Sequence, residues 1–206
     1  EGLKIARRLL LDLNENGAWG AGNTYEANFV VGNNQGMAFW LRGDGNAVVN
    51  NIIAFNDYSG LGVIGLGNTV SSNTLHSATW RAARVYGNGN TITYNRIFGN
   101  GGPGLGVFGS GNLIAANDVS SNFNGSSDGN GIRVYGSSNV IRDNVVSSNA
   151  VTGLLVAGGR DNWHDHDYHL LYAAPGSANL VMNNRVDLNG REGMRIQGSS
   201  NVVTLN

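Results

Sequence analysis

The stretch Asn139-Val-Ile-Arg-Asp-Asn144-Val-Val-Ser-Ser-Asn149 sets the pattern that the whole chain follows. It places an asparagine at every fifth position and an aliphatic residue at the same place inside each gap. Copies of this pattern recur along the sequence, so the chain is an internal repeat. The copies begin at Asn23, Asn46, Asn68, Asn90, Asn112, Asn139, Asn179 and Asn201, mostly 22 residues apart.

A unit of 22 residues is too short for a pair of helices or for a propeller blade. It fits one coil of a parallel β-helix, in which three short strands each pair with their counterparts one coil away. We therefore predict an all-β solenoid of about 8–9 coils, forming a single domain over residues 1–206. Because the repeat runs into both ends of the sequence, we expect the chain to be a fragment of a longer protein.

Composition narrows the class of protein. The 206 residues include 32 glycines, 2 prolines and no cysteine, so neither disulfides nor thiolate-bound zinc are expected. Hydrophobic residues make up 41% and are periodic, which excludes low-complexity disorder. A formal net charge of −1 gives no bulk attraction to nucleic acid or to an anionic membrane, so we expect neither as a partner. No apolar run approaches the length of a transmembrane helix.

Each coil divides into three strands. Strand A is the glycine-bracketed piece, as in Gly131-Ile-Arg-Val-Tyr-Gly136, and strands B and C lie between successive asparagines. Alternation sends the second and fourth residues of strand A inward. Together with one aliphatic residue from each of strands B and C, they predict a continuous stacked core. Gly2-Leu-Lys-Ile-Ala6 also matches strand A and is predicted to open the chain as a further coil.

The asparagines are interpreted as a structural ladder. Asparagine tolerates the left-handed backbone conformation that a sharp bend between strands requires. Stacked in register, each side-chain amide can bond to the next coil and to the backbone of the turn. A ligand-binding role for these amides is the alternative.

The repeat is interrupted at residues 7–22, 123–128 and 159–176, and all three interruptions flank strand A. Loops on a rigid scaffold often carry function, so we predict a groove on the outer face of strand A. Residues 6–13 are interpreted as a helical cover over the first coil. A homo-oligomer contact, a flanking domain or a cap is expected at the open ends, because terminal repeats need covering.

The outward residues of strand A combine cations and aromatic rings. Arginine forks match carboxylates, and aromatic rings stack on sugar faces, so we predict a binding surface for an acidic polysaccharide. The alternative is that long side chains simply cover the sheet and keep it soluble. The two outward columns include Lys4, Trp40, Arg84, Arg133 and Arg195, and Arg42, Tyr86, Phe108 and Tyr135.

The longest interruption contains Asp161-Asn-Trp-His-Asp-His-Asp-Tyr-His169. Its imidazoles and carboxylates can bind a divalent cation such as calcium, although no cofactor is required by the pattern and HExxH does not occur. His164, His166 and Tyr168 can instead act as general base and acid. A polar loop without chemistry is the third reading.

The unit N-x-[VI]-x-x-N-x-[VIL]-x-x-N followed by G-[LIM]-x-[VI]-x-G resembles the right-handed parallel β-helix repeats of the pectate-lyase-like superfamily. It is most similar to carbohydrate-binding and sugar-hydrolase repeats, which also occur in mannuronan C5-epimerases. The resemblance implies a right-handed coil, an active site on the outer face of strand A, and a secreted, cell-surface or periplasmic location. The Asp-Pro-His-(Glu/Asp) signature of the epimerase and alginate-lyase branch does not occur, and His164-Asp-His-Asp167 matches it only in part.

We therefore expect a lyase or epimerase that acts on a uronate-containing polysaccharide. In it, Arg84, Arg133 and Arg195 neutralise substrate carboxylates, and the residues of the His164 loop transfer the proton. One alternative is a glycoside hydrolase or transferase that uses a carboxylate pair from Asp128, Asp161, Asp165 and Glu192. Another is a non-catalytic adhesin, tailspike-like or structural protein. The predicted catalytic residues are His164, His166, Tyr168, Arg133, Arg84 and Asp165, and the predicted substrate-binding residues are Arg195, Trp40, Tyr86, Phe108, Tyr135, Trp163 and Asp128.

Overall fold

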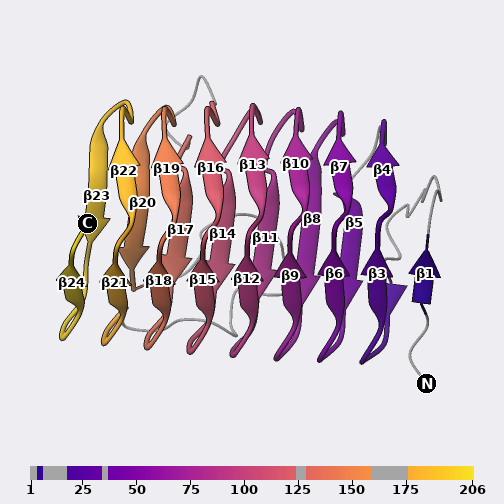
Figure 1. The fold of residues 1–206 in the computed structure, drawn as a ribbon, viewed down its shortest axis with the longest axis horizontal. Coiled ribbons are helices and arrows are strands. Elements are labelled where there is room, and N and C mark those ends of the chain that lie inside the picture. The colour runs from indigo at the N-terminus through magenta and orange to yellow at the C-terminus, as the bar shows by residue number, and fades with distance from the viewer. Residues whose placement is uncertain (1–3, 7–17, 34–36, 124–128, 159–175) are drawn as a thin grey trace.

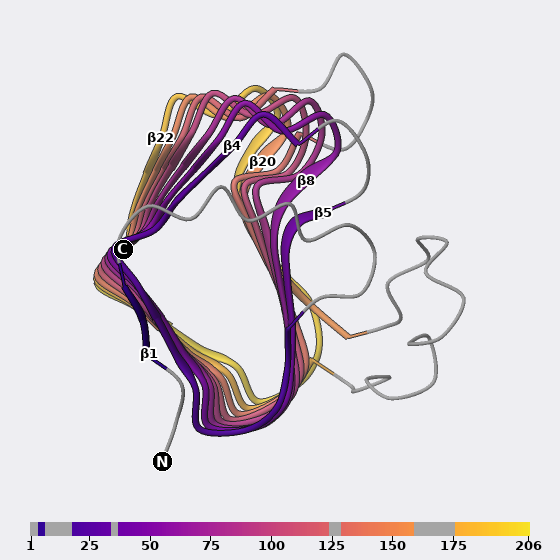
Figure 2. The same cartoon turned by 90° about the vertical axis from the view of Figure 1, so that its right-hand side faces the viewer.

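The structure is a computed structural model that describes residues 4–6, 18–33, 37–123, 129–158 and 176–206. The predicted right-handed parallel β-helix is confirmed: every strand pairing is parallel, and three sheets run side by side along one axis (Figure 1). Viewed along that axis, the coils superimpose and the sheets surround a common interior (Figure 2). Among the described residues, no helix is long and apolar enough to cross a membrane.

The three sheets correspond to the three predicted strands of each coil. Sheet A contains β2 (Ala18–Trp19), β5 (Met37–Arg42), β8 (Ser59–Ile64), β11 (Ala83–Tyr86), β14 (Leu105–Phe108), β17 (Ile132–Tyr135), β20 (Thr152–Ala157) and β23 (Glu192–Ile196). Sheet B contains β1 (Lys4–Ala6), β3 (Thr24–Glu26), β6 (Ala47–Val49), β9 (Thr69–Ser71), β12 (Thr91–Thr93), β15 (Leu113–Ala115), β18 (Val140–Arg142), β21 (Leu180–Met182) and β24 (Val202–Thr204). Sheet C contains β4 (Phe29–Val31), β7 (Ile52–Ala54), β10 (Thr74–His76), β13 (Arg96–Phe98), β16 (Asp118–Ser120), β19 (Val145–Ser147) and β22 (Arg185–Asp187).

The core consists of the predicted aliphatic columns. Burying them removes apolar surface from water in every coil, which drives the stacking. Tyr25 joins them at the N-terminal end, where its ring meets the Phe39 ring edge-on at a centroid distance of 5.1 Å. Burial raises the pKa of Tyr25 above its ordinary value. Fully buried examples from the three sheets are Leu61, Val63, Leu105, Ile132, Ile92, Ile141, Val119 and Val146.

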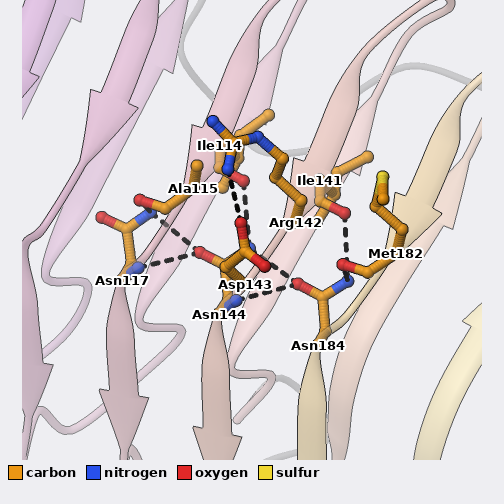
Figure 3. A network of polar contacts seen from close by, with 9 residues as sticks. All are labelled: Ile114, Ala115, Asn117, Ile141, Arg142, Asp143, Asn144, Met182 and Asn184. Carbon is orange, nitrogen blue, oxygen red and sulfur yellow. Dashed lines mark hydrogen bonds and ion pairs between the residues drawn. The ribbon is translucent and has the colours of Figure 1, made fainter. Parts of the chain in front are cut away.

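The asparagine ladder holds the coils in register. Asn144 Oδ1 accepts from the backbone N–H and from the Nδ2 of Asn117, both at 3.0 Å (Figure 3). Asn144 Nδ2 donates to Asn184 Oδ1 at 2.8 Å and to the Ile114 carbonyl at 3.0 Å. The buried amide of Asn144 therefore has both its donor and its acceptor satisfied, as burial requires. The same side-chain bonds join Asn28, Asn51, Asn73, Asn95, Asn117, Asn144, Asn184 and Asn206 without a break.

One part of the ladder prediction is wrong, because the asparagine itself is not left-handed. The residue before it is: Ser138, Asp143 and Ser148 have φ of 56–57° and precede ladder asparagines. The asparagine must point its amide into the ladder, so the bend falls on its neighbour, whose side chain can turn outward. Even large side chains occur at this position, including the exposed Tyr94 and Leu188.

The N-terminal coil also differs from the prediction. β1 pairs with β3, with Lys4 opposite Thr24, so it extends sheet B and Lys4 does not belong to the outer face of sheet A. Sheet A begins instead with β2, in which Trp19 lies opposite Arg42. A short apolar alternation fits strands A and B equally well, which is why the sequence pattern misplaced it. Residues 18–22, predicted as part of an insertion, thus belong to the regular coil.

The last coil leaves its core residues open. Val203 is 49% exposed, whereas Val181, its partner one coil earlier in the same column, is fully buried. Val202 and Leu205 are also exposed. The apolar core column therefore reaches the end of the described solenoid.

Candidate functional site on the outer face of sheet A

Cations, aromatic rings and glycines lie in register on the outer face of sheet A. Arg84 in β11 lies opposite Gly106 in β14, which in turn lies opposite Arg133 in β17. Two residues further along the same strands, Tyr86 and Phe108 form the next aligned pair, and Tyr135 continues their column. Apart from Lys4, the predicted columns are therefore confirmed in register, and side chains far apart in sequence meet on one face.

Three arginines converge on one hollow in this face. Arg84 and Arg133 come from the strands on either side of Gly106, and Arg81 comes from the turn that leads into β11. The hollow itself has room for about one water molecule, because the roughly 230 Å³ of empty space around it includes open solvent, and its lining is completed by Ala83, Pro103 and Phe108. Because Gly106 has no side chain, the Phe108 ring can lie over it between the two arginine strands: a Cβ at Gly106 would come within 2.8 Å of Phe108 Cε2. Arg81 and Arg84 are only 4% and 3% exposed, so their guanidinium groups sit in the floor of the hollow.

Arg84 is oriented by the aromatic column beside it. Its Nη1 donates to the Tyr86 hydroxyl oxygen at 3.0 Å. The Tyr86 ring stacks on Phe108 at 4.7 Å and 16°, and Phe108 stacks on Tyr135 at 5.5 Å and 5°. Both faces of Phe108 are therefore covered by neighbouring rings, and Tyr86 is itself only 5% exposed. Phe108 is only 3% exposed, so its faces offer no stacking surface to a ligand, and the stacked rings form a wall beside Arg84.

Trp80 and Arg81 are site residues that the repeat pattern did not identify. The Arg81 guanidinium lies over the Trp80 ring at 4.4 Å from its centroid, a cation–π contact that fixes its direction. Tyr58 meets Trp80 edge-on at 4.7 Å. A Cβ at Gly102 would come within 2.6 Å of Trp80 Cδ1, so the indole needs that glycine one coil away. One sequence signal could have identified them. The positions that hold Gly101, Gly102 and Pro103 in one coil hold Thr79, Trp80 and Arg81 in the coil before it.

A second cluster of rings and charge lies at the N-terminal end of the same face. The Arg42 guanidinium is 4.6 Å from the centroid of Trp19 and 5.6 Å from that of Trp40. Trp19 is 66% exposed. The Trp40 ring extends over Gly62 in the next strand, where a Cβ would overlap it. Trp40 was predicted from sequence, whereas Trp19 was hidden in the presumed insertion.

Two further predicted residues that the structure describes, Arg195 and Glu192, do not line the hollow. Arg195 in β23 is exposed and separated from Arg133 by Leu155 of β20. Glu192 accepts a hydrogen bond from the Thr152 hydroxyl at 3.2 Å, also away from the hollow. The predicted residues Asp128, Trp163, His164, Asp165, His166 and Tyr168, together with Asp161, lie outside the described residues.

Metal ligands were expected in the same histidine loop. Within the described ranges, no three His, Asp or Glu side chains are grouped as they would be around a metal ion. The loop that was predicted to bind a divalent cation such as calcium is itself outside those ranges, so that expectation stays a prediction.

Comparison with known proteins agrees with this architecture. The periplasmic alginate epimerase AlgG has a TM-score of 0.65 and 20% sequence identity, and the match covers 90% of this chain and 43% of that chain. Mutants of the same enzyme give TM-scores of 0.64 and 0.62, at 20% and 21% identity, with 90% of this chain and 44% of each solved chain covered. At this identity the likeness shows the fold alone, and the chain spans less than half the length of these solved chains. No curated protein sequence matches the chain.

The sequence also matches a family model described as a right-handed β-helix region over residues 17–167, which is more than half of the chain. The three parallel sheets and the asparagine ladder are the structural form of that match. The chain therefore belongs to the right-handed β-helix family.

Proposed function

We propose that this protein acts on a uronate-containing polysaccharide, as a lyase or an epimerase, with the glycan bound on the outer face of sheet A. The observation that carries the proposal is the convergence of Arg81, Arg84 and Arg133 on one hollow around Gly106. Planar guanidinium groups bind carboxylates through paired N–H donors, and three of them favour an anionic group strongly. A neutral polysaccharide would make no use of this charge.

The arginines supply what both reactions need first. A uronate loses the proton on the carbon next to its carboxylate only if the negative charge that moves onto the carboxylate oxygens is stabilised. Guanidinium groups at those oxygens provide that stabilisation. In a lyase, the electron pair then forms a double bond, and the glycosidic oxygen leaves with a proton. In an epimerase, a proton returns to the opposite face of the same carbon.

The proton acceptor and donor are proposed to come from the His164 loop, through His164, His166 or Tyr168. These residue types suit the task, since imidazole and phenol can both exchange protons with a bound substrate. Asp165, Trp163 and Asp128 are proposed to contact the same substrate. A divalent cation such as calcium remains an optional addition, to be tested by chelation.

The solved neighbours support the substrate class. AlgG is a periplasmic alginate epimerase, and alginate is a polymer of uronates. A secreted, cell-surface or periplasmic location for this protein is proposed on the same ground. A homo-oligomer, or a flanking domain at the solenoid ends, is proposed from the exposed core residues of the last coil.

The experiment is to incubate the protein with alginate, pectate, a glycosaminoglycan and a neutral glucan, with and without a chelator. A lyase gives an ultraviolet-absorbing unsaturated product, and an epimerase changes the NMR signals of the sugar ring without cutting the chain. Arg133→Ala should abolish either activity, while Ser147→Ala, on the outer side of sheet C, should leave it unchanged. New reducing ends without the unsaturated product would favour a hydrolase. Binding without turnover would favour a non-catalytic glycan-binding protein.

A further inference from the structure

We infer that Trp19, Arg42 and Trp40 form a distal subsite for the same acidic polysaccharide, so that the glycan runs along the solenoid axis. The inference rests on the proposed function and adds to it a direction and a second point of attachment. These three residues lie on β2 and β5, at the N-terminal end of sheet A.

The geometry of Trp19 is that of a stacking platform. Its indole is 66% exposed, yet its orientation is fixed by the Arg42 guanidinium at 4.6 Å from the ring centroid. The Arg42 guanidinium also lies 5.6 Å from the centroid of the Trp40 ring. Cation–π contacts of this kind keep a ring in place without covering it fully. A large, pre-oriented aromatic surface loses little conformational entropy when a ligand stacks on it.

The platform and the arginine hollow share one continuous face. Trp19 lies opposite Arg42, Arg42 lies opposite Ile64, and Ile64 lies opposite Tyr86, so three strand steps lead from β2 to β11. At a spacing of about 4.8 Å per step, Trp19 is roughly 14 Å from the β11 strand and roughly 24 Å from β17. The Trp40 ring bridges part of this distance, because it lies over Gly62 on the side of the hollow.

The chemistry of the platform fits the ligand proposed for the hollow. Indole faces take the apolar face of a sugar ring, and Arg42 places a positive charge beside them for a uronate carboxylate. A polymer with a carboxylate on every ring can satisfy both sites at once. Linking two contacts in one chain raises the overall affinity without new contacts at either site.

The test compares ligand lengths. Binding of a mannuronate disaccharide, which is confined to the hollow, is measured against that of a mannuronate oligomer long enough to span about 24 Å. The wild type should bind the long oligomer more tightly. Trp19→Ala should weaken that binding by roughly tenfold, which corresponds to about 1.4 kcal/mol, and leave the disaccharide affinity unchanged. Trp19→Phe should retain most of the gain, and Phe55→Ala, a similarly exposed ring that follows β7 of sheet C, should retain all of it.

The outcomes separate the two proposals. If Trp19→Ala still bound the long oligomer more tightly than the disaccharide by the wild-type factor, the distal subsite would be overturned and the hollow would stand. The same conclusion would follow if the wild type bound both lengths with equal affinity. If the wild type bound neither length, the proposed function itself would fail, and the subsite with it. Thermal unfolding of each variant verifies that a lost affinity reflects the surface and not the fold.

Discussion

Asn144 donates its Nδ2 hydrogen to Asn184 Oδ1 across 2.8 Å, although the two residues are 40 positions apart in the sequence. Asn117, only 27 positions earlier, donates to Asn144 Oδ1 at 3.0 Å. Elsewhere in the column the same bond spans 22 or 23 positions. The extra residues between coils therefore leave the ladder unchanged, and it is the ladder, not a constant repeat length, that fixes which residues of sheet A stand side by side.

Asn144→Leu should destabilise the protein by about 3 kcal/mol or more, because it leaves several buried donors and acceptors unpaired. Urea unfolding would measure the loss. The matched control is Asn88→Leu, since Asn88 is exposed, its side-chain oxygen accepts a hydrogen bond from the Ser110 N–H, and Leu66 occupies the equivalent position one coil earlier. It should cost less than about 1 kcal/mol. Equal costs for the two variants would show that the ladder is dispensable.

The position before each ladder asparagine offers a second test. Leu188 has φ of 54° and is 83% exposed, so Leu188→Gly should stabilise the protein by about 0.5–1 kcal/mol through relief of left-handed strain. Gly99 occupies the same position in another coil, with φ of 62° and no atom near its would-be Cβ. Gly99→Ala should therefore destabilise by about 1 kcal/mol through the backbone alone. In thermal unfolding, the melting temperature should therefore rise for Leu188→Gly and fall for Gly99→Ala. A shift in the same direction for both variants would count against placing the bend at this position.

A further asparagine column runs through Asn33, Asn56, Asn100, Asn122, Asn149 and Asn189, and Ala78 takes the place of an asparagine between Asn56 and Asn100. Replacing Ala78 by asparagine should therefore stabilise the protein. The Ala78 N–H donates to Asn100 Oδ1 at 3.0 Å, as a ladder residue does. On the other side, Asn56 Nδ2 is buried and has no acceptor within the described structure. Ala78→Asn should give it one and raise the free energy of unfolding by about 1–2 kcal/mol. Ala78→Leu, which adds volume without an acceptor, should fail to stabilise the protein, and a gain in both variants would point to packing instead.

The buried Tyr25 should make the stability of the protein depend on pH in the alkaline range. Burial raises the pKa of Tyr25, so the folded protein holds the phenol proton more tightly than the unfolded chain does. The contribution of the protonated Tyr25 to the free energy of unfolding is fully present below a pH of about 10, the pKa in the unfolded chain. It is lost as the pH rises through the higher pKa of the folded protein. Tyr25→Phe should remove this component, so its unfolding free energy should fall less steeply than that of the wild type above pH 10. Tyr94→Phe, an exposed tyrosine, should keep the wild-type profile; the same change in both variants would exclude burial as the cause.

The repeat made most of the fold predictable. Asparagine spacing located strands B and C, and the glycine brackets located strand A, because each recurs with the coil. The exception is at the N-terminus, where Lys4–Ala6 joined sheet B and Ala18–Trp19 joined sheet A. Three alternating residues carry too little pattern to distinguish two strands of the same coil.

The site was predictable only where it lies on periodic strands. Arg84 and Arg133 followed from the outward columns, and their proximity followed from register. Trp80 and Arg81 lie in a turn, where no periodicity marks them. The enclosure of Phe108 between two rings depends on side-chain angles, which spacing does not determine.

We expect the arginine hollow to distinguish ligands by their charge. Calorimetric titration would compare a uronate oligomer with the same oligomer after its carboxylates are reduced to alcohols, for the wild type and for Arg81→Gln. We predict that the wild type binds the acidic oligomer at least about tenfold more tightly, and that Arg81→Gln loses most of that preference. Equal affinity of the wild type for the acidic and the neutral oligomer would contradict the assignment of this face to uronate recognition.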